Sequence, residues 1–426
     1  MNRKILALAI PSIIANITTP LLGLVDTAIV GHMGNAVYIG AIAVGGVMFN
    51  MLYWLFGFLR GGTSGLTAQA YGAGSRPECA LVLYRSLTVA AGVGIAMILL
   101  QWPLGWLLQR FIDPDPATGS LAIRYFTILI YGAPAVLGTY ALSGWFLGMQ
   151  DSRMLMVTSI VINVVNIAVS LALVYGLGWQ IEGVACGTLV AQWTGFATGL
   201  WLLRRYRVGR PDWRQTARGS ELRRFFKVNA DMMLRTACLI AVTVWFTKTG
   251  ASQGAVILAV NTLLMQLFLL FSYMMDGFAF AGEALAGRYV GARDFASLHR
   301  CARRLFVWGG IWAILFTALY FFGGEGFLGL LSSDSDVIAA SRDYYLWAVS
   351  VPLAGFAAFA WDGVFIGATL TRQLLLSMAA AMAAFFILYF SLFNIMGNHA
   401  LWLAFTVYLF LRGFIQTILY YRHKWN

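Results

Sequence analysis

The residues best suited to chemistry in this 426-residue sequence are one acid and several neutral polar groups inside apolar segments. Asp26 is the one carboxylate well inside an apolar segment of the first half. Asn163, Asn166 and Ser170 are spaced three and four residues apart, which places them on one face of a helix. Thr188 lies in the next apolar segment. We therefore predict a hydrogen-bonded acid that lines a cavity.

Asp26 is predicted to carry a proton. Burial disfavours the charged form of a carboxylate, and protonation would switch its bonds to Asn166 and Thr188. Pro11 and Pro20 lie in the same segment and would let that helix bend. The alternative is that Asp26 only ties helices together through neighbouring amides and hydroxyls. We favour the proton carrier because a neutral residue would serve packing with less desolvation. Taken by themselves, Asn163 and Thr188 are better explained as polar residues that hold helices together.

A second group of charged residues lies in the second half. Asp231 and Arg235 stand four residues apart and are predicted to form an ion pair on one helix. Asp276 and Asp362 are expected to lie near the same face. Such a cluster could bind Na⁺, but we favour an inner gate or a structural charge cluster because charge is tolerated near the membrane interface.

The composition excludes a water-soluble enzyme. Hydrophobic residues make up 60% of the chain and charged residues 11%, against roughly 45–50% and 25% in soluble proteins. Apolar stretches of about 20 residues match the thickness of a bilayer, and they must be helices to satisfy their backbone groups in lipid. The net charge of +12 falls mainly in short loops, which indicates a topology signal and not nucleic-acid binding.

Hydropathy predicts an all-α polytopic membrane protein of about twelve spans. Basic loops gather on one side of these spans, so both termini and the middle loop are expected to face the cytoplasm, in the inner (plasma) membrane. The expected spans are 5–30, 37–62, 82–102, 121–147, 153–176, 179–203, 226–250, 255–281, 301–323, 343–368, 373–396 and 399–421.

The chain reads as two six-helix bundles, 1–203 and 226–426, joined by a cytoplasmic linker at 204–225. The halves match without gaps at an offset of 219 residues. Arg153 then aligns with Arg372, and Gly178 aligns with Gly397. Because six spans per half is an even number, the halves share one orientation. Parallel repeats of this kind are typical of transporters that bind substrate between two lobes.

Other chemistries find little support in the sequence. No phosphate-binding GxxxxGK[ST] motif occurs, so ATP drive within the chain is not expected. The cysteines and histidines show no metal-ligand spacing, so no metal site and no cofactor other than a coupling ion is predicted. An intramembrane enzyme would need a nucleophile and base at one depth. A flippase for lipid-linked precursors stays open, although mid-span basic residues are few.

Several segments resemble the multidrug and toxic compound extrusion (MATE) family, in its DNA-damage-inducible F (DinF) branch. The resemblance covers nearly the whole chain. The segments that carry it are PLLGLVDTAIVGHMG, GLTAQAYGAG, NADMMLRTACL, YMMDGFAFAGEALAGRYVGARD, WDGVFIGAT and GNHALWLA.

The resemblance implies a V-shaped pair of bundles that exchanges cations for lipophilic, often cationic, toxic compounds. It places the coupling acid on Asp26, its partners on Asn166 and Thr188, and the helix bend on Pro11. Ser170 stands where many relatives carry a second carboxylate, which favours H⁺ over Na⁺.

Asp362 resembles a second-lobe carboxylate of the sodium-coupled branch and keeps Na⁺ coupling as an alternative. We therefore expect a monomeric, proton-coupled antiporter for small amphiphilic or cationic drugs and toxins, with no nucleic-acid partner.

Overall fold

The computed structural model describes residues 1–31, 36–112, 115–209, 219–331 and 335–425, and every regular element among them is helical. Eleven segments are long and apolar enough to cross a membrane. The expected all-α membrane protein is thereby confirmed. The helix over 181–203, predicted as a span, is not one of the eleven; its Gly, Thr and Gln residues dilute its apolar character.

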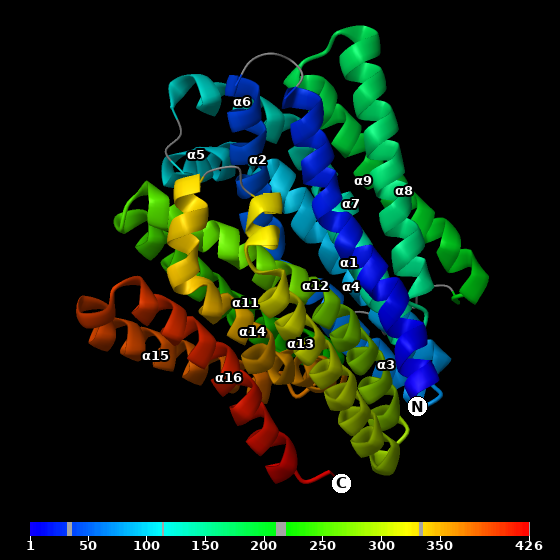
Figure 1. The fold of residues 1–426 in the computed structure, drawn as a ribbon. Coiled ribbons are helices and arrows are strands. Elements are labelled where there is room, and N and C mark those ends of the chain that lie inside the picture. The colour runs from blue at the N-terminus through cyan, green and yellow to red at the C-terminus, as the bar shows by residue number, and fades with distance from the viewer. Residues whose placement is uncertain (32–35, 113–114, 210–218, 332–334, 426) are drawn as a thin grey trace. The chain divides into compact units, whose positions relative to one another are not determined.

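The first half contains the following helices, shown from blue to green in Figure 1. They are α1 (Asn2–Gly31), α2 (Ala36–Leu55), α3 (Phe58–Gly72), α4 (Arg76–Leu99), α5 (Gln101–Ile112), α6 (Pro116–Leu129), α7 (Ala133–Gly148), α8 (Arg153–Leu171) and α9 (Ile181–Leu203). A π-helical turn, Ala172–Gly176, follows α8, and a 3-10 turn, Ile130–Gly132, joins α6 to α7. The expected span 37–62 is therefore divided between α2 and α3.

Longer helices build the second half. They are α11 (Gly219–Ser252), α12 (Ala255–Gly291), α13 (Phe295–Leu331), α14 (Ser335–Gly367), α15 (Thr371–Met396) and α16 (Asn398–Arg422). Figure 1 shows α15 and α16 side by side, in agreement with their contacts. The α12 helix has 37 residues, ten more than the expected 255–281, because its last turns mix small residues with Glu283 and Arg288, which lower the hydropathy but do not end the helix.

The chain forms two compact units. One consists of Met1–Ile13 with Ala230–Asn426, and the other of Ile14–Asn229. Their boundary falls inside α1, between Pro11 and Pro20. Phe225, in the segment expected to be a linker, is buried against Leu66 and Val82 of the Ile14–Asn229 unit. The boundaries proposed at 203 and 226 stay a prediction, and residues 210–218 of that linker lie outside the described residues.

Aromatic side chains fill the core of the unit that contains Ala230–Asn426. Phe271, Tyr320, Phe385 and Trp402 are fully or almost fully buried in one cluster. Rings of this size bury large apolar areas and favour edge-to-face contacts, as between Phe271 and Phe316 at 5.6 Å. This unit therefore has a rigid, largely apolar interior.

The internal repeat is visible in the backbone. Six of the described residues with positive φ form three pairs that are 219 positions apart in the sequence. The pairs are Gly74 with Arg293, Gln150 with Thr369, and Gly178 with Gly397. The first two pairs end a helix with the same backbone hydrogen bonds in both halves, so the repeat reaches down to individual turns.

The same offset relates two helix crossings. A Cβ atom on Gly144 of α7 would collide with the backbone carbonyl of Arg60, and one on Gly363 of α14 would collide with that of Ala279. Glycine is required at such close approaches of two backbones. The α3–α7 and α12–α14 crossings are therefore copies of one packing unit.

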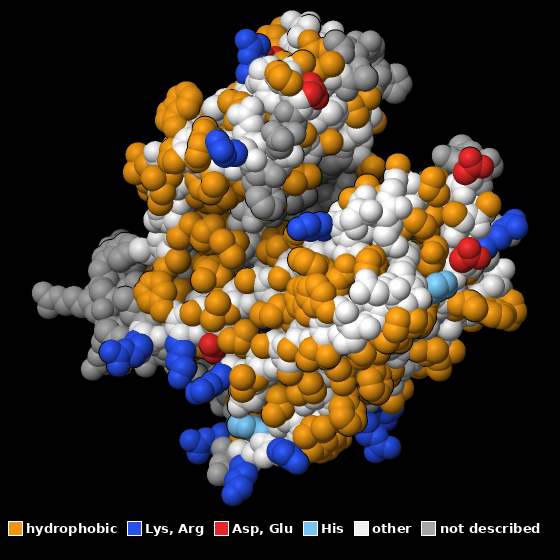
Figure 2. Space-filling view, turned by 90° about the vertical axis from the view of Figure 1, so that its left-hand side faces the viewer, with side chains coloured by type: hydrophobic (Ala, Val, Ile, Leu, Met, Phe, Trp, Pro, Cys, Tyr) orange, Lys and Arg blue, Asp and Glu red, His pale blue; other side chains and the backbone are white. Residues whose placement is uncertain are grey.

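Hydrophobic side chains cover much of the face seen in Figure 2, and Lys and Arg side chains gather along its lower edge. Several large apolar residues are strongly exposed, including Leu99 at 75%, Phe322 at 85% and Ile395 at 80%. Such a surface is suited to lipid and not to water.

Candidate functional site in the Ile14–Asn229 unit

A chain of hydrogen bonds joins three helices around Asp26. The hydroxyl of Thr188, on α9, donates to Asp26 Oδ2 at 3.0 Å. The side-chain amide of Asn166, on α8, donates to Thr188 Oγ1 at 2.9 Å. All three side chains are buried, with Asp26 and Thr188 each 3% exposed and Asn166 fully covered. The structure therefore brings together the acid and two of its predicted partners.

Three oxygen atoms of this region have no hydrogen-bond partner among the described residues. They are Asp26 Oδ1, Asn166 Oδ1 and Ser170 Oγ, and all are buried. Ser170 Oγ lies against Gly187 of α9, where a Cβ atom would collide with it. A buried polar atom without a partner costs about 1–3 kcal/mol. The site is therefore held in a state that a proton, a cation or water would stabilise.

Asn163 does not join this cluster. Its amide donates to the carbonyl of Ser159, four residues earlier on the same helix, at 2.9 Å. A local bond of this kind competes with contacts to other helices. The shared helical face predicted for Asn163 and Asn166 thus does not translate into a shared site.

Tyr125 of α6 is a neighbour that the sequence did not single out. It is 4% exposed and lies within interaction range of both Thr188 and Asp26. Its ring fills the space above Gly45 of α2, where any side chain would collide with it. In an aromatic-rich chain, a single Tyr gives no signal of its own. Only the packing of α2 against α6 places it here.

The two prolines lie on the helix that carries the acid. The α1 helix runs without a break from Asn2 to Gly31 through both Pro11 and Pro20. A proline inside a helix removes one backbone hydrogen bond, so these are the weak points of α1. Whether α1 bends there stays a prediction.

A different network surrounds Asp362 in the unit of Met1–Ile13 and Ala230–Asn426. Asp362, on α14, is 6% exposed. Its Oδ2 accepts bonds from Arg235 of α11 and, at 2.8 Å, from Arg412 of α16. Its Oδ1 accepts a bond from Gln416 Nε2 at 2.8 Å. Both carboxylate oxygens are therefore engaged, and two guanidinium groups balance the charge.

The predicted ion pair between Asp231 and Arg235 is wrong. Arg235 pairs with Asp362 instead, and Asp231 Oδ2 accepts a hydrogen bond from Thr371 Oγ1 at 2.9 Å. The buried carboxylate has no water to solvate it, so it takes the guanidinium, whereas partly exposed Asp231 does not need it. Asp276 of α12 is also only partly buried, and its charge acts on Arg412.

Sequence reasoning missed Arg412 and Gln416. Both lie within an apolar helix, where an Arg is costly and normally pairs with another charged or polar group. That signal was present in the sequence. What it could not provide was the identity of the partner, which lies 50 residues earlier on α14.

Comparisons with known proteins agree with this architecture. The MatE family profile matches residues 11–171 and 230–395. DNA damage-inducible protein F of Escherichia coli (strain K12) is 39% identical over 422 residues, which cover 98% of this chain and 92% of that protein. Protein DETOXIFICATION 44, chloroplastic, of Arabidopsis thaliana is 26% identical over 86% of this chain and 72% of its own length.

Solved structures share the fold. The Vibrio cholerae MATE transporter VcmN in its bent form superposes with a TM-score of 0.88 at 16% identity, over 99% of this chain and 96% of that one. A MATE crystal structure in the bent conformation gives 0.85 at 18% identity, over 98% and 94%. At such identities the likeness shows the fold alone. The family profile and the Escherichia coli relative show more: this chain is an integral membrane protein that belongs to the MATE family of multidrug and toxin efflux transporters, and not an enzyme.

Proposed function

We propose that this transporter exports amphiphilic or cationic toxic compounds in exchange for protons, and that Asp26 carries the proton. We place it in the inner (plasma) membrane with both termini in the cytoplasm, acting as a monomer. The basic loops on one side of the spans support this orientation.

The observation that carries the proposal is the neutral environment of Asp26. Its bonded partner is the Thr188 hydroxyl, which is in turn held by the Asn166 amide. Among the residues that the structure describes, no Lys, Arg or His forms an ion pair with Asp26. A buried charge without a counter-ion is strongly disfavoured, so binding a proton here removes an unbalanced charge.

Protonation also changes what Asp26 can bond to. As a carboxylate it accepts only, and as an acid it gains one donor. The Thr188 hydroxyl now donates to Asp26, and a protonated acid would require that hydroxyl or another oxygen to accept. Such a reversal would reorient the Thr188–Asn166 chain and alter how α1 packs against α8 and α9.

A cationic substrate and a proton would compete for the same negative charge. Deprotonated Asp26 attracts a cation in a low-dielectric site, and protonation abolishes that attraction. Exchange of one proton for one monovalent cation moves no net charge, so it would respond to a pH gradient and not to voltage. With a neutral substrate, each proton would gain about 2.3 kcal/mol per 100 mV.

Transport by reconstituted vesicles tests the proposal. We would impose a pH gradient and a sodium gradient separately and follow efflux of cationic dyes and bile-type amphiphiles. A pH gradient at clamped sodium is expected to drive transport in the wild type and not in Asp26→Asn. Wild-type efflux by Asp26→Asn at equal protein content would contradict the role of Asp26.

Sodium coupling is the second candidate, and one observation favours it. The unsatisfied oxygens of Asp26, Asn166 and Ser170 are hard donors of the kind that alkali and alkaline-earth cations prefer. The second-lobe carboxylate is a weaker candidate, because Arg235, Arg412 and Gln416 occupy both oxygens of Asp362. Transport driven by sodium at clamped pH would select this alternative.

A further inference from the structure

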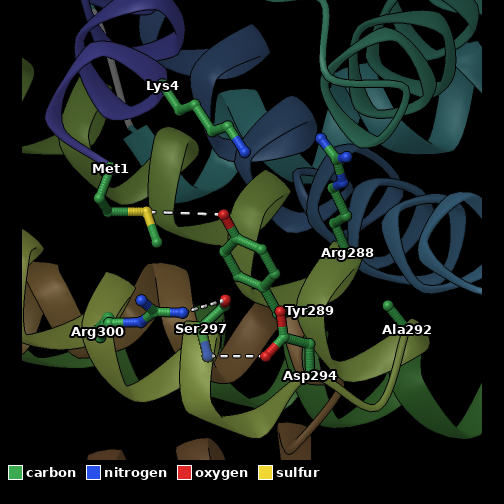
Figure 3. A pocket seen from close by; sticks show the side chains of 8 residues that line it. All are labelled: Met1, Lys4, Arg288, Tyr289, Ala292, Asp294, Ser297 and Arg300. Carbon is green, nitrogen blue, oxygen red and sulfur yellow. Dashed lines mark hydrogen bonds between the residues drawn. The ribbon is translucent and has the colours of Figure 1, made fainter.

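A cavity of about 390 Å³ opens in the unit of Met1–Ile13 and Ala230–Asn426, and Asp362 is not among its lining residues. The start of α1, the end of α12 and the start of α13 form it (Figure 3). Its polar lining includes Lys4, Arg288, Tyr289, Asp294 and Arg300. Three basic side chains thus face one acidic side chain around a single space.

The basic groups approach the cavity from different helices. Figure 3 shows the side chains of Lys4 and Arg288 extending to the same side of the Tyr289 ring. On the other side, Arg300 Nη2 donates to Ser297 Oγ at 3.1 Å. Within the described part of the chain, no carboxylate forms an ion pair with Lys4 or Arg300. The cavity therefore carries positive charge that the protein itself does not neutralise.

The carboxylate of Asp294 caps a helix. Its Oδ1 accepts the backbone N–H of Ser297 at 3.0 Å, which caps the first turn of α13. Hydrogen bonds from the Ser297 side chain and backbone lower the pKa of Asp294. Its charge thus serves the helix terminus and offsets only part of the basic lining.

The first half shows that the fold does not need this basic lining. The α3–α4 turn has the same backbone hydrogen bonds as the α12–α13 turn, 219 residues earlier. Ser75 there caps α4 as Asp294 caps α13. The positions of Arg288, Tyr289 and Arg300 are held in the first half by neutral residues, namely Gln69, Ala70 and Leu81.

One more basic residue, Arg293, stands in the turn between the lining residues Ala292 and Asp294 but does not itself line the cavity. Arg293 adopts φ 56° where the first half has Gly74. A left-handed conformation costs a non-glycine residue about 1–2 kcal/mol, so glycine would be the easier choice. The second half thus keeps an arginine at a strained position beside a cavity that is already basic.

We propose that this cavity binds the phosphate group of an anionic ligand, and that the ligand is an anionic phospholipid of the adjacent leaflet. Guanidinium groups bind phosphate oxygens in pairs, and Lys adds a point charge. Basic pockets at the ends of membrane helices bind anionic headgroups for the same reason. The bound headgroup lies between Lys4 of α1 and Arg288 of α12 on one side and Arg300 of α13 on the other, and so fastens the first turn of α1.

Binding to the full chain in neutral detergent tests this site. Tryptophan fluorescence would be titrated with dioctanoyl phosphatidylglycerol, dioctanoyl phosphatidylcholine, glycerol phosphate and inorganic phosphate at fixed ionic strength. Phosphatidylglycerol is expected to bind saturably and phosphatidylcholine weakly. The Lys4→Gln/Arg300→Gln double variant should bind phosphatidylglycerol about 30-fold more weakly, at about five-fold for each basic group.

Two controls keep the test specific. Arg76→Gln removes an exposed charge from the matching turn of the first half and should bind as the wild type does. Arg300→Lys keeps the charge and should retain most of the affinity. If glycerol phosphate and inorganic phosphate bind as tightly as phosphatidylglycerol, and the double variant loses all three, the site stands and its ligand is a soluble phosphate. Equal binding of phosphatidylcholine, or undiminished binding by the double variant, would overturn the proposal.

Discussion

Each of the two units buries an aspartate, Asp26 in one and Asp362 in the other, and the surroundings of the two side chains are opposite in kind. Asp26 is held by a neutral hydroxyl with an amide behind it. Asp362 is held by two guanidinium groups and an amide. Removing the charge of Asp26 leaves no described cation without its ion-pair partner, whereas removing that of Asp362 leaves the buried Arg412 and the partly buried Arg235 without theirs. The first arrangement is suited to a group that changes protonation state, and the second to a fixed ion pair.

The repeat makes this contrast sharper. The positions that match Asp26, Asn166 and Ser170 in the second half hold Trp245, Phe385 and Tyr389. These rings pack together, with Tyr389 5.8 Å from Trp245 and 6.4 Å from Phe385. The scaffold is thus stable with an aromatic cluster at this place. The polar cluster of the first half is therefore not required by the fold, which supports a functional role.

The largest expected effect concerns Asp26. Asp26→Asn is expected to reduce proton-driven efflux at least 100-fold, because an amide cannot exchange a proton, while the melting temperature stays within a few degrees of the wild type. Efflux at a fixed pH gradient and thermal unfolding in detergent measure the two effects. Asp115→Asn, the same change at the exposed cap of α6, is the control and should transport normally.

Asp362→Asn should mainly affect stability. It leaves the buried Arg412 and the partly buried Arg235 without the carboxylate that pairs with them, and breaking a buried ion pair costs about 3–5 kcal/mol. We expect a clear loss of unfolding free energy in a denaturant titration. Adding Arg412→Met should restore part of it. If the single variant is as stable as the wild type and loses only transport, the assignment of Asp362 as a fixed ion pair is wrong.

Variants of two asparagines on α8 distinguish an effect on the site from an effect on helix packing. Asn166→Ala removes the bond to Thr188 and should slow proton-driven efflux about two- to tenfold, the range of one net hydrogen bond. Asn163→Ala removes only a bond to its own helix and should change efflux less than two-fold. Equal effects of the two variants would argue that α8 acts only through packing.

The smallest expected effect is on the caps of the matching turns. The pKa of Asp294 is lowered by its bonds to Ser297, so its contribution to α13 is complete above the ordinary Asp value of about 3.9 and is lost as the pH falls through the lower folded-state value. Ser75 at the matching cap of α4 does not titrate. Hydrogen exchange, corrected for intrinsic rates, should show the start of α13 loosening as the pH falls below the ordinary Asp range, and the start of α4 unchanged. Asp294→Ser should abolish the difference.

Much of the architecture could be predicted because lipid restricts the choices. Long apolar runs must be helices, and the order of residues along the sequence shows the 219-residue repeat. The division of 37–62 into α2 and α3 could not be predicted in this way. It depends on a 3-10 turn at Phe56 and Gly57, and hydropathy does not register such a break.

The site was only partly predictable. Helical spacing brought Asn166 close to Asp26 in depth, but it grouped Asn163 with them, because spacing gives a face and not the direction of a side chain. The partners of Asp362 depend on how α11, α14 and α16 pack. Arg412 was visible as an arginine in an apolar helix, yet the Asp231–Arg235 spacing favoured a nearer partner that the fold does not use.

The division of α1 between the two units bears on how the protein is made. Ile13 contacts Gly277 closely enough that a Cβ there would collide with its side chain, and Met1 Sδ accepts the hydroxyl of Tyr289. At about 5–20 residues per second, synthesis needs roughly 13 to 50 s to progress from one contact partner to the other. During biogenesis Met1–Ile13 must therefore remain in the bilayer without their contact partners. The unit of Met1–Ile13 and Ala230–Asn426 can form only after α12 has been translated.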